Sequence, residues 1–337
     1  MNVFVTGGAG YIGSHTCLEL LLNGWNVTVF DNFSNSCSQS LDRVEKITNR
    51  KISLIEGDVR NTHDLTLAIK SSAADAVIHF AGLKSVGESN AFPVRYYDNN
   101  VTGTISLLKA MVANELKKLV FSSSATVYGT PEKLPIPEVA PTSTTNPYGQ
   151  SKLMVEKILS DVAKSDDNWK IANLRYFNPA GADESGLIGE NPKDIPNNIM
   201  PYISQVAVGK LRELSVFGGD YDTHDGTGVR DYIHVSDLAK GHLSALKYIS
   251  NNEAADFCSF NLGTGKGVSV LELVKAFEKA SGKSIPFDIV ARRQGDVAAC
   301  YADPTKANKV LGWKAELDIE RICQDAWRWQ VNNPTGY

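Results

Sequence analysis

The chain has 337 residues, of which 42% are hydrophobic and 21% charged, and this balance is typical of a globular protein with a sizeable core. The formal net charge of -4 and the lack of any Lys/Arg-rich run argue against a nucleic-acid partner. No segment has the pattern of a secretory signal or a membrane span, and neither the five scattered cysteines nor the six histidines have metal-site spacing. We therefore expect a cytoplasmic protein with free thiols, no metal and no membrane contact.

Short apolar runs alternate with helix-period segments through the first 175 residues. The expected strands cover residues 2–7, 26–31, 52–58, 76–82, 118–124 and 171–177, and helical segments at 12–24, 62–72 and 101–114 lie between them. Strands that alternate with helices predict right-handed βαβ units and a doubly wound parallel sheet, the α/β Rossmann class. Ligands of such a sheet bind at the carboxyl ends of its strands.

The texture of the sequence changes after about residue 177. Long Gly-, Pro- and Asn-rich stretches such as "ADESGLIGENPKDIPNNIMP" and "FGGDYDTHDGTGVRD" interrupt shorter regular segments. Loops of this length in a compact chain are often functional, so we interpret them as walls of a second ligand site. The sequence thus predicts a dinucleotide-binding domain at 1–177 and a smaller α/β substrate domain at 178–337, with an approximate boundary across which segments can interleave.

A glycine-rich stretch, "TGGAGYIGS", follows the first expected strand and opens the first helix. Gly7, Gly10 and Gly13 permit a tight turn and a close backbone approach, so that a pyrophosphate can rest on helix N-terminal amides. Asp31 ends the second strand 18 residues after Gly13, where a carboxylate would bind a ribose 2′-hydroxyl and repel a 2′-phosphate. The pattern favours NAD over NADP, although a glycine-rich turn followed by a turn aspartate would look the same. Asp58 and Val59 end the next strand and are expected to border the adenine.

Tyr148 and Lys152 lie four residues apart in "NPYGQSKLMVEKIL", where Asn146 can cap a helix and Pro147 can open it. A phenol has a pKa of ~10, and an adjacent ammonium together with a positive nicotinamide would lower it toward that of a base that works near neutrality. Ser124, at the end of "KLVFSSS", could relay a hydrogen bond between a substrate oxygen and this phenol. The alternatives are a chance pair on an exposed helix and a turn serine.

The sequence resembles the extended short-chain dehydrogenase/reductase family, and within it the UDP-galactose 4-epimerases. The resemblance extends over nearly the whole chain through "VTGGAGYIGSHT", "DNFSNS", "VIHFAGLKSVGES", "FSSSATVYG", "PYGQSKLMVE", "LRYFNPAGA", "DGTGVRDYIHVSDLA", "NLGTGKGVSVLE" and "RRQGD". It implies a tightly held NAD that is used and regenerated within one turnover. The implied reaction interconverts UDP-glucose and UDP-galactose through a 4-keto intermediate.

The resemblance also implies a role for each matching residue. Tyr148 would be the base, Lys152 its electrostatic partner and ribose contact, and Ser124 the hydrogen-bond relay to the substrate. The implied NAD contacts are Gly7, Gly10, Tyr11, Ile12, Gly13, Asp31, Asn35, Asp58, Val59, Phe80, Ala81, Lys84, Asn99, Tyr148, Lys152 and Phe177. The implied UDP-hexose contacts are Ser124, Asn178, Asn198, Phe217, Arg230, Arg293 and Cys300.

Arg230 and Arg293 have the chemistry of a diphosphate clamp, since a guanidinium binds oxyanions in a bidentate manner. The alternatives are an ion pair between Arg230 and Asp231 and a solvated strand position for Arg293. Cys300 is small where some relatives carry a tyrosine, so the pocket could also accept UDP-N-acetylglucosamine and UDP-N-acetylgalactosamine. The alternative is that Cys300 is simply a small buried residue.

Two other functions compete with this interpretation. A dehydratase or reductase could use the same scaffold, but dehydratases of this family carry an Asp-Glu pair where Ala125 and Thr126 stand here. A catalytically silent NAD-binding protein would keep the glycines without needing Tyr148, Lys152 and Ser124 together. We also expect a homodimer, because residues 102–115 and 151–164 resemble the helices through which related enzymes dimerise.

Overall fold

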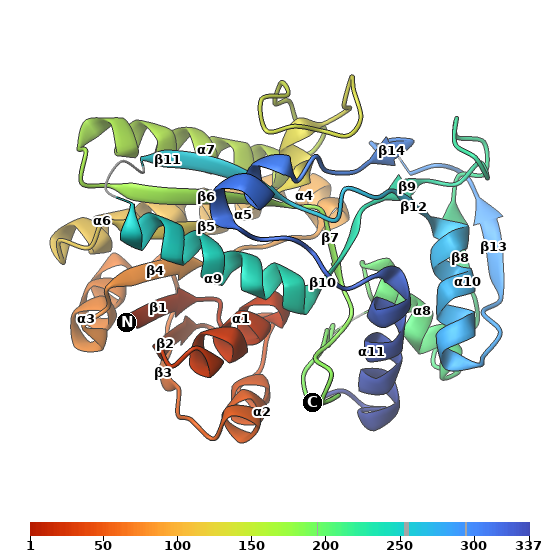
Figure 1. Cartoon of the computed structure of the whole chain (residues 1–337), viewed down its shortest axis with the longest axis horizontal. Helices are drawn as coiled ribbons and strands as arrows, with labels where there is room; N and C mark the ends of the chain where they lie inside the picture. Colours follow the sequence, from red (N-terminus) through yellow and green to blue (C-terminus); the bar gives the residue numbers. More distant parts are fainter. Residues whose placement is uncertain (194, 253–255, 294) are drawn as a thin grey trace.

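The computed structural model describes residues 1–193, 195–252, 256–293 and 295–337. Its largest element is a seven-stranded sheet in which every neighbouring pair is parallel, and Figure 1 shows helices on both sides of it. This confirms the predicted α/β doubly wound class. The strands, in spatial order, are β11 (Phe257–Leu262), β6 (Lys170–Tyr176), β5 (Lys118–Ser124), β4 (Ala76–His79), β1 (Asn2–Thr6), β2 (Asn26–Asp31) and β3 (Ser53–Glu56).

The strand order reverses between β1 and β4. The chain builds outward from β1 through β2 to β3, and then returns to place β4, β5, β6 and β11 on the other side of β1. In an open parallel sheet, the carboxyl ends of the strands on either side of such a reversal leave a crevice for a ligand. The site should therefore lie at the ends of β1 and β4, where the glycine-rich turn begins.

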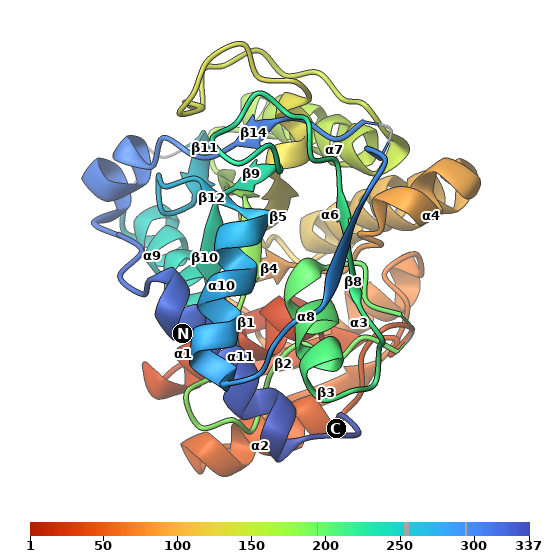
Figure 2. The same cartoon turned by 90° about the vertical axis from the view of Figure 1, so that its right-hand side faces the viewer.

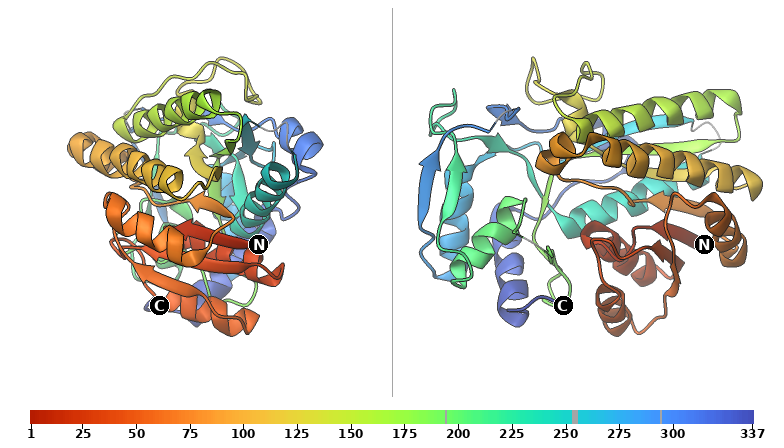
Figure 3. Two further views of the ribbon diagram at one scale, coloured as in Figure 1. Left: turned by 90° about the vertical axis from the view of Figure 1, so that its left-hand side faces the viewer. Right: turned by 180° about the vertical axis from the view of Figure 1, so that it is seen from behind.

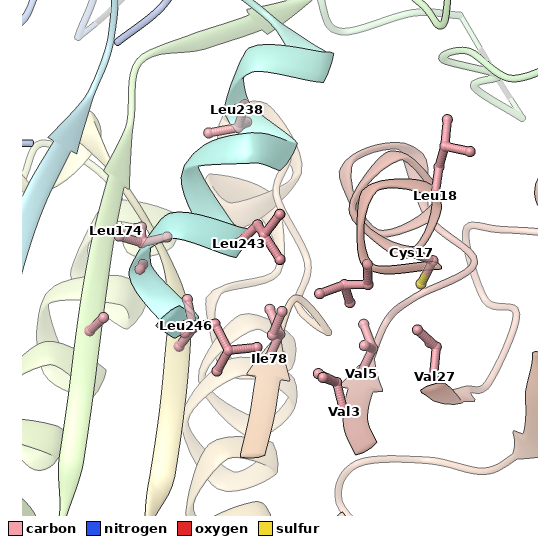
Figure 4. Close-up of a cluster of buried hydrophobic side chains, with 14 of the residues drawn as sticks. Val3, Val5, Cys17, Leu18, Val27, Ile78, Leu174, Leu238, Leu243 and Leu246 are labelled. Carbon is pink, nitrogen blue, oxygen red and sulfur yellow. The ribbon is translucent and has the colours of Figure 1, made fainter. Parts of the chain in front are cut away.

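Each face of the large sheet is covered by its own helices, and the two hydrophobic clusters between the layers share no residue. Val3 and Val5 of β1 belong to one cluster and Phe4 to the other, since successive strand residues point to opposite faces. Figure 4 shows the first cluster, in which β1 packs against α1, and α9 covers the strands on the other side of β1. The helices on this face are α1 (Tyr11–Leu22), α2 (Gln39–Thr48) and α9 (Val235–Asn251).

The opposite face carries the helix with the predicted catalytic pair. The views in Figure 3 show α3, α6 and α7 stacked along this side of the sheet. The elements of this layer are α3 (Thr62–Ser72), α4 (Val86–Ala91), α5 (Pro93–Tyr97), the π-helical turn η1 (Asp98–Thr102), α6 (Gly103–Ala113), the 3-10 turn η2 (Ala125–Tyr128) and α7 (Pro147–Ser165).

A smaller part of the molecule has its own core and lies beyond the strand ends of the large sheet (Figure 2). Its helices are α8 (Ile199–Ala207), α10 (Val270–Ser281) and α11 (Ile319–Asn332), and Phe277, Leu273 and Ile322 are fully buried among them. Its short strands are β7 (Asn178–Ala180), β8 (Leu214–Phe217), β9 (Val229–Arg230), β10 (Tyr232–His234), β12 (Val268–Ser269), β13 (Phe287–Val290) and β14 (Ala299–Cys300), and one π-helical turn, η3 (Ala307–Leu311), follows them.

After its first passage through the smaller part, the chain returns to the large sheet. After β7 to β10, helix α9 packs against α1 and strand β11 adds itself to the edge of the large sheet beside β6. The two parts therefore interleave along the sequence, and the division at residue 177 stays a prediction. Over the described ranges, no helix is both long and apolar enough to cross a bilayer.

Candidate active site

The first turn of α7 is fixed by its cap. Asn146 adopts an extended conformation and its side-chain oxygen accepts a hydrogen bond from the Gly149 N–H at 2.8 Å, while Pro147 occupies the first helical position. Both features were expected, because the cap satisfies a free N–H and proline at that position loses no helix hydrogen bond. The cap places Tyr148 in the first turn and Lys152 one turn later.

Lys152 is buried, and its ammonium faces the end of β5. The Nζ atom donates a hydrogen bond to the carbonyl oxygen of Ser122 at 2.7 Å and lies 4.9 Å from the centre of the Phe121 ring. Burial lowers the pKa of Lys152 to about 8, and the negative charge of Glu156 acts in the opposite direction. The Lys152 ammonium therefore begins to lose its proton at a pH slightly above neutrality.

Tyr148 is within hydrogen-bonding contact of Ser124, so the structure brings these two predicted residues together. Burial raises the pKa of the Tyr148 phenol, whereas the Ser124 hydrogen bond and the positive charge of Lys84 lower it. The expected net lowering by Lys152 is thus not seen in the protein alone, because desolvation of the phenol outweighs the nearby charges. Lys84, expected only as a dinucleotide contact, is the cation that favours the Tyr148 phenolate here.

The glycine-rich turn after β1 has no room for larger side chains. Gly7 has a φ of +70°, and a Cβ atom there would stand 2.6 Å from the Ala81 nitrogen. At Gly13 a Cβ would stand 2.3 Å from the Gly7 carbonyl oxygen. Gly10 caps α1 without a side chain, which leaves the amides of the first turn free of a side-chain cap. The tight turn therefore brings the first-turn amides of α1 to the end of β1, an arrangement that suits a pyrophosphate.

Asp31 ends β2 beside this turn. Its carboxylate accepts hydrogen bonds from the backbone N–H groups of Ala9 at 3.0 Å and Phe33 at 2.9 Å, and from the Ser36 hydroxyl at 2.9 Å. Asp31 therefore ties the glycine-rich turn to the loop after β2, a role that the sequence did not suggest. Asn35 is exposed in the same loop.

The residues after β3 form the next rim of the crevice. Asp58 accepts a hydrogen bond from Asn32 at 3.1 Å and forms an ion pair with Arg60 at 2.8 Å, and the Arg60 guanidinium holds the pKa of Asp58 at about 2. Val59 is buried, and a Cβ on Gly103 would meet its side chain at 2.9 Å. Strand β3, which ends just before Asp58 and Val59, pairs with β2, which ends at Asp31. The predicted Asp58 and Val59 thus lie on the same side of the cradle as Asp31.

Two aromatic residues predicted as dinucleotide contacts pack against segments that come after residue 177 in the chain. The Tyr11 hydroxyl donates to the carbonyl oxygen of Gly181 at 2.7 Å, and the Phe80 ring packs at 4.8 Å from the His242 ring on α9. His242 is also hydrogen-bonded to Tyr176, at the end of β6. Sequence reasoning missed His242 and Tyr176, because their pairing depends on α9 returning to the sheet.

One carboxylate joins predicted residues of both ligand sites. Glu190 forms an ion pair with Lys84 at 3.0 Å, and the same Oε1 atom accepts a hydrogen bond from the Asn198 amide at 2.6 Å. Glu190 lies in a long loop without periodicity, so no pattern around it points to a function. Asn99, also predicted, donates to the side chain of the buried Asn100 at 3.0 Å.

The remaining predicted substrate residues lie on the short strands of the smaller part, apart from Arg293, which lies between β13 and β14. Arg230 of β9 is paired in register with Cys300 of β14, which places the two side chains beside each other. The Arg293 guanidinium lies 4.5 Å from the centre of the Phe217 ring. Asn178 begins β7 directly after the buried Phe177. Gln294, within the "RRQGD" motif, lies outside the described residues.

The alternative ion pair between Arg230 and Asp231 is absent from this part of the described chain. The buried Asp231 carboxylate instead accepts hydrogen bonds from the backbone N–H groups of Thr264 at 2.8 Å, Gly265 at 3.0 Å and Ala302 at 3.1 Å. The Arg230 guanidinium donates to the Val229 carbonyl oxygen at 2.9 Å. Arg230 therefore keeps donors for an anionic ligand.

These features together define a class of protein. A phosphate cradle at the start of α1 opens toward the ends of β4 and β5, where a tyrosine, a lysine and a serine gather. This is the arrangement of a dinucleotide-dependent enzyme that moves a proton to or from a hydroxyl group. The second set of residues, on the short strands, supplies a place for an anionic substrate beside it.

Comparisons with known proteins specify this class further. A family model described as GDP-mannose 4,6 dehydratase matches residues 4–326. The UDP-glucose 4-epimerases of Bacillus subtilis (strain 168) and Homo sapiens are 57% and 56% identical to the chain, which they match over its full length and over 99% and 98% of their own. The crystal structure of UDP-glucose 4-epimerase from Bifidobacterium longum in complex with NAD+ and UDP superimposes with a TM-score of 0.96 at 55% identity over the whole of both chains. The chain belongs to the UDP-glucose 4-epimerase family.

Proposed function

We propose that the protein interconverts UDP-glucose and UDP-galactose with a bound NAD, by oxidising C4 of the hexose to a 4-keto sugar and reducing it on the opposite face. The observation that carries this proposal is the group formed by Tyr148, Ser124 and Lys152 at the ends of β5 and α7, beside the glycine cradle. The identity of more than half of all residues with UDP-glucose 4-epimerases supports the same reaction.

The chain's own residues fit a dinucleotide. Gly7 and Gly13 allow the turn to pack closely against the Ala81 backbone and against itself, and the first-turn amides of α1 have no side-chain cap, so they suit a pyrophosphate. When bound, NAD supplies the acceptor and the donor of the C4 hydride. The residues that would hold it are Gly7, Gly10, Tyr11, Ile12, Gly13, Asp31, Asn35, Asp58, Val59, Phe80, Ala81, Lys84, Asn99, Tyr148, Lys152 and Phe177.

Tyr148 is the group that would take the proton from the sugar O4. Ser124 is its hydrogen-bond partner and would hold O4 against the phenol, while the ammonium of Lys84 favours the phenolate and Lys152, held by the Ser122 carbonyl oxygen, would contact the dinucleotide ribose. Because the protein alone keeps the phenol protonated, the added positive charge of the oxidised nicotinamide would complete the activation. The proton then returns to O4 from the same phenol when the keto group is reduced.

The nucleotide end of the substrate would carry most of the binding energy. Arg230 and Arg293 offer guanidinium donors to the diphosphate, and Phe217, Asn178 and Asn198 lie on the same short strands and loops. The hexose itself must turn over between the two hydride transfers, so strong contacts to the sugar would slow the reaction. Firm binding of UDP and weak binding of the hexose satisfy both needs.

A dehydration reaction is disfavoured, although the matching family model bears the description of a dehydratase. Loss of the C6 hydroxyl needs a further acid close to the serine strand. Ala125 and Thr126, which follow Ser124 in η2, have no acidic proton to give. Among the described residues after β5, the nearest carboxylates along the chain are those of Glu132 and Glu138, and Glu138 is used to hold the Asn261 N–H.

The proposed reaction is tested by mixing the purified protein with UDP-galactose without adding NAD. We expect UDP-glucose to form, because the resident dinucleotide is regenerated in each turnover. The same reaction run in deuterated water should give a product with no solvent deuterium at C4, since the hydride returns directly. Failure to form UDP-glucose when NAD is also added, or substantial deuterium at C4, would contradict the proposal.

We also propose that UDP-N-acetylglucosamine and UDP-N-acetylgalactosamine are substrates. Cys300 is half-buried beside Arg230, and burial raises the pKa of its thiol to about 11, so it remains a small neutral side chain. A small neutral wall at this place would leave space for an N-acetyl group on C2 of the hexose.

A homodimer in the cytoplasm completes the proposal. The layer formed by α5, α6 and α7 exposes apolar side chains, namely Val94, Val112 and Met154 together with Phe92 just before α5. Sedimentation velocity at micromolar concentration should show a species of twice the mass of the chain, and a monomer at that concentration would contradict the dimer.

A further inference from the structure

A buried ion pair lies beneath α7, and the proposed mechanism does not use it. The carboxylate of Glu156 on α7 receives two parallel hydrogen bonds from the guanidinium of Arg175 on β6, from Nε at 3.0 Å and from Nη2 at 2.7 Å. The two side chains are only 5% and 8% exposed. A bidentate pair in such surroundings has a fixed geometry, which makes it suitable for holding other groups in place.

The Glu156 carboxylate has a third donor, and that donor belongs to the site. Oε1 accepts a hydrogen bond from the Ser123 hydroxyl at 2.5 Å. Ser123 stands between Ser122, whose carbonyl oxygen receives the Lys152 ammonium, and Ser124, which contacts the Tyr148 phenol. One carboxylate thus ties the end of β5 to α7, one helical turn beyond Lys152.

Arg175 has partners of its own on the far side of this pair. Its Nη1 donates to the Tyr128 hydroxyl oxygen at 2.9 Å and to the Glu138 carbonyl oxygen at 3.1 Å. The Tyr128 hydroxyl in turn donates to the side chain of Asn261 at 2.7 Å. These contacts anchor the guanidinium independently of Glu156, so a change at Glu156 need not displace Arg175.

The elements packed against α7 bring further charged and titratable groups. Glu88 of α4 pairs with Arg95 of α5 at 2.6 Å and accepts the Tyr96 hydroxyl, and Asp98 of η1 pairs with Arg60 at 2.7 Å. The other such groups on these elements and on β4 are His79, which faces Lys152, and Tyr97, Lys118, Tyr128, Lys170, Arg175, Tyr176 and Cys258, while Lys84 lies in the loop after β4 and Tyr148 on α7 itself. Glu156 is the charged group that acts on the pKa of Lys152.

We propose that Glu156 is a positioning residue of the proposed epimerisation site, which holds Ser124 and Tyr148 in register across β5 and α7 and keeps an anion one turn from the Lys152 ammonium. This inference rests on the proposed function. The negative charge of Glu156 partly offsets the lowering of the Lys152 pKa by burial. Without that charge, the ammonium would lose its proton at a lower pH, and without the bond to Ser123 the end of β5 would be held less firmly, so the phenol would lose part of the Ser124 hydrogen bond that lowers its pKa.

The test compares two variants of the NAD-bound protein. In Glu156→Gln we expect the basic limb of the kcat profile for UDP-galactose to move down by about one pH unit, with an unchanged KM. The matched control is Glu138→Gln, which removes a carboxylate that holds the Asn261 N–H at 2.8 Å in the same buried network but lies outside the site. The control should lose stability without moving either limb of the pH profile.

A second measurement does not depend on turnover. Ultraviolet difference titration of the NAD-bound protein, with the same background carrying Tyr148→Phe as the reference, isolates the ionisation of Tyr148. We expect the Tyr148 pKa to be higher in Glu156→Gln than in the wild type, and to be unchanged in Glu138→Gln. Glu156→Asp, which keeps the charge, should restore most of the wild-type titration.

The possible outcomes separate this inference from the proposed function. If the wild type does not epimerise, the proposed function fails, whereas the titration of Tyr148 still reports on Glu156. If Glu156→Gln leaves both the pH profile and the Tyr148 titration where Glu138→Gln leaves them, Glu156 has only a structural role. If Glu156→Gln does not fold, Ser123→Ala removes the bond from β5 alone, and a kcat that stays at the wild-type value would also overturn the proposal.

Discussion

Tyr148 shows how far a single side chain depends on its ligand for its chemistry. In the protein alone, burial raises the pKa of the phenol more than Ser124 and Lys84 lower it. A phenol in this state is a poor base near neutrality, so it does not take up a proton before the dinucleotide is bound. The bound dinucleotide would therefore act on Tyr148 by its charge as well as on the sugar.

Replacing Tyr148 by phenylalanine tests this role. We expect kcat for UDP-galactose to fall by about 10²–10⁴-fold, because general-base catalysis contributes on that scale. The ring remains, so the NAD content, measured after denaturing the protein, should stay close to one per chain. Tyr202→Phe, on α8 in the other part of the molecule, is the control and should keep the wild-type rate. A Tyr148→Phe variant with the wild-type rate would refute the assignment.

Cys300 is the residue at which substrate choice can be tested. Tyrosine at this position would place a ring beside Arg230, in the space that an N-acetyl group needs. We expect Cys300→Tyr to lose turnover of UDP-N-acetylglucosamine and to keep that of UDP-galactose, both measured as kcat/KM. Cys300→Ala should keep both activities. An equal loss of both activities in Cys300→Tyr would show that Cys300 does not select the substrate.

The sequence could predict individual residues only where their role is local. The cap formed by Asn146, the glycine cradle and the Tyr148–Lys152 spacing can all be read within a few residues. Glu190, which joins Lys84 to Asn198, could not be found in this way, because the three residues lie far apart along the chain and meet only in the folded protein.

At the scale of elements, the six strands β1 to β6 of the large sheet were predicted to within three residues at each end, because most of them are continuous apolar runs, whereas β11 was not predicted. The expected strand at 118–124 coincides with β5. Helix α2 was missed, since only Ser40, Leu41 and Val44 are buried along its ten residues and its hydrophobic face is correspondingly thin. A helix that is short and mostly polar contains no apolar run long enough to stand out, even when its few apolar residues share one face.

The N-cap of α7 can be tested by substitution, because it positions the first turn, which carries Tyr148. Asn146→Ala leaves the Gly149 N–H without its partner and should lower the free energy of unfolding by about 1 kcal/mol. The same change should reduce kcat, since Tyr148 lies in the first turn. Asn146→Asp keeps a capping oxygen and suits the positive end of the helix dipole, so it should retain both properties. Urea unfolding and the epimerase assay measure them, and an aspartate variant as unstable as the alanine variant would contradict the cap.

At the scale of the whole molecule, the sequence could not show how the two parts are joined. "DFCSFNLG" has the pattern of a strand, but its position beside β6 follows from α9 packing on α1, which is a tertiary event. The contact between β10 and α11 could not be predicted from the sequence either. His234 accepts the Ser236 N–H on Nδ1 at 3.0 Å, so its Nε2–H donates to Asp325 at 3.2 Å.

Asp325 is therefore the residue at which the contact between β10 and α11 can be tested. Its side chain is 1% exposed and also pairs with Arg321 at 2.5 Å and with Arg328. Burial alone would raise the pKa of Asp325, but the hydrogen bonds from His234 and Arg321 outweigh it and hold the pKa below its usual value. The folded state thus binds the Asp325 proton less tightly than the unfolded chain does, so the ionised carboxylate stabilises the fold. This stabilisation is present above the unfolded pKa of about 3.9 and is lost as the pH falls through the lower pKa of the folded state.

Asp325→Asn should lower the free energy of unfolding at pH 7 by about 2 kcal/mol, the scale of hydrogen bonds to a charged group. The difference from the wild type should shrink as the pH falls below about 4, because the wild-type carboxylate is then neutralised as well. Glu184→Gln is the matched control, since Glu184 also pairs with Arg321 at 2.8 Å but is 77% exposed, and it should change stability by less than about 0.5 kcal/mol. Urea unfolding across this pH range measures both variants. A deficit in Asp325→Asn that stays constant from pH 7 to acid would mean that packing, and not the charge of Asp325, holds α11 against β10.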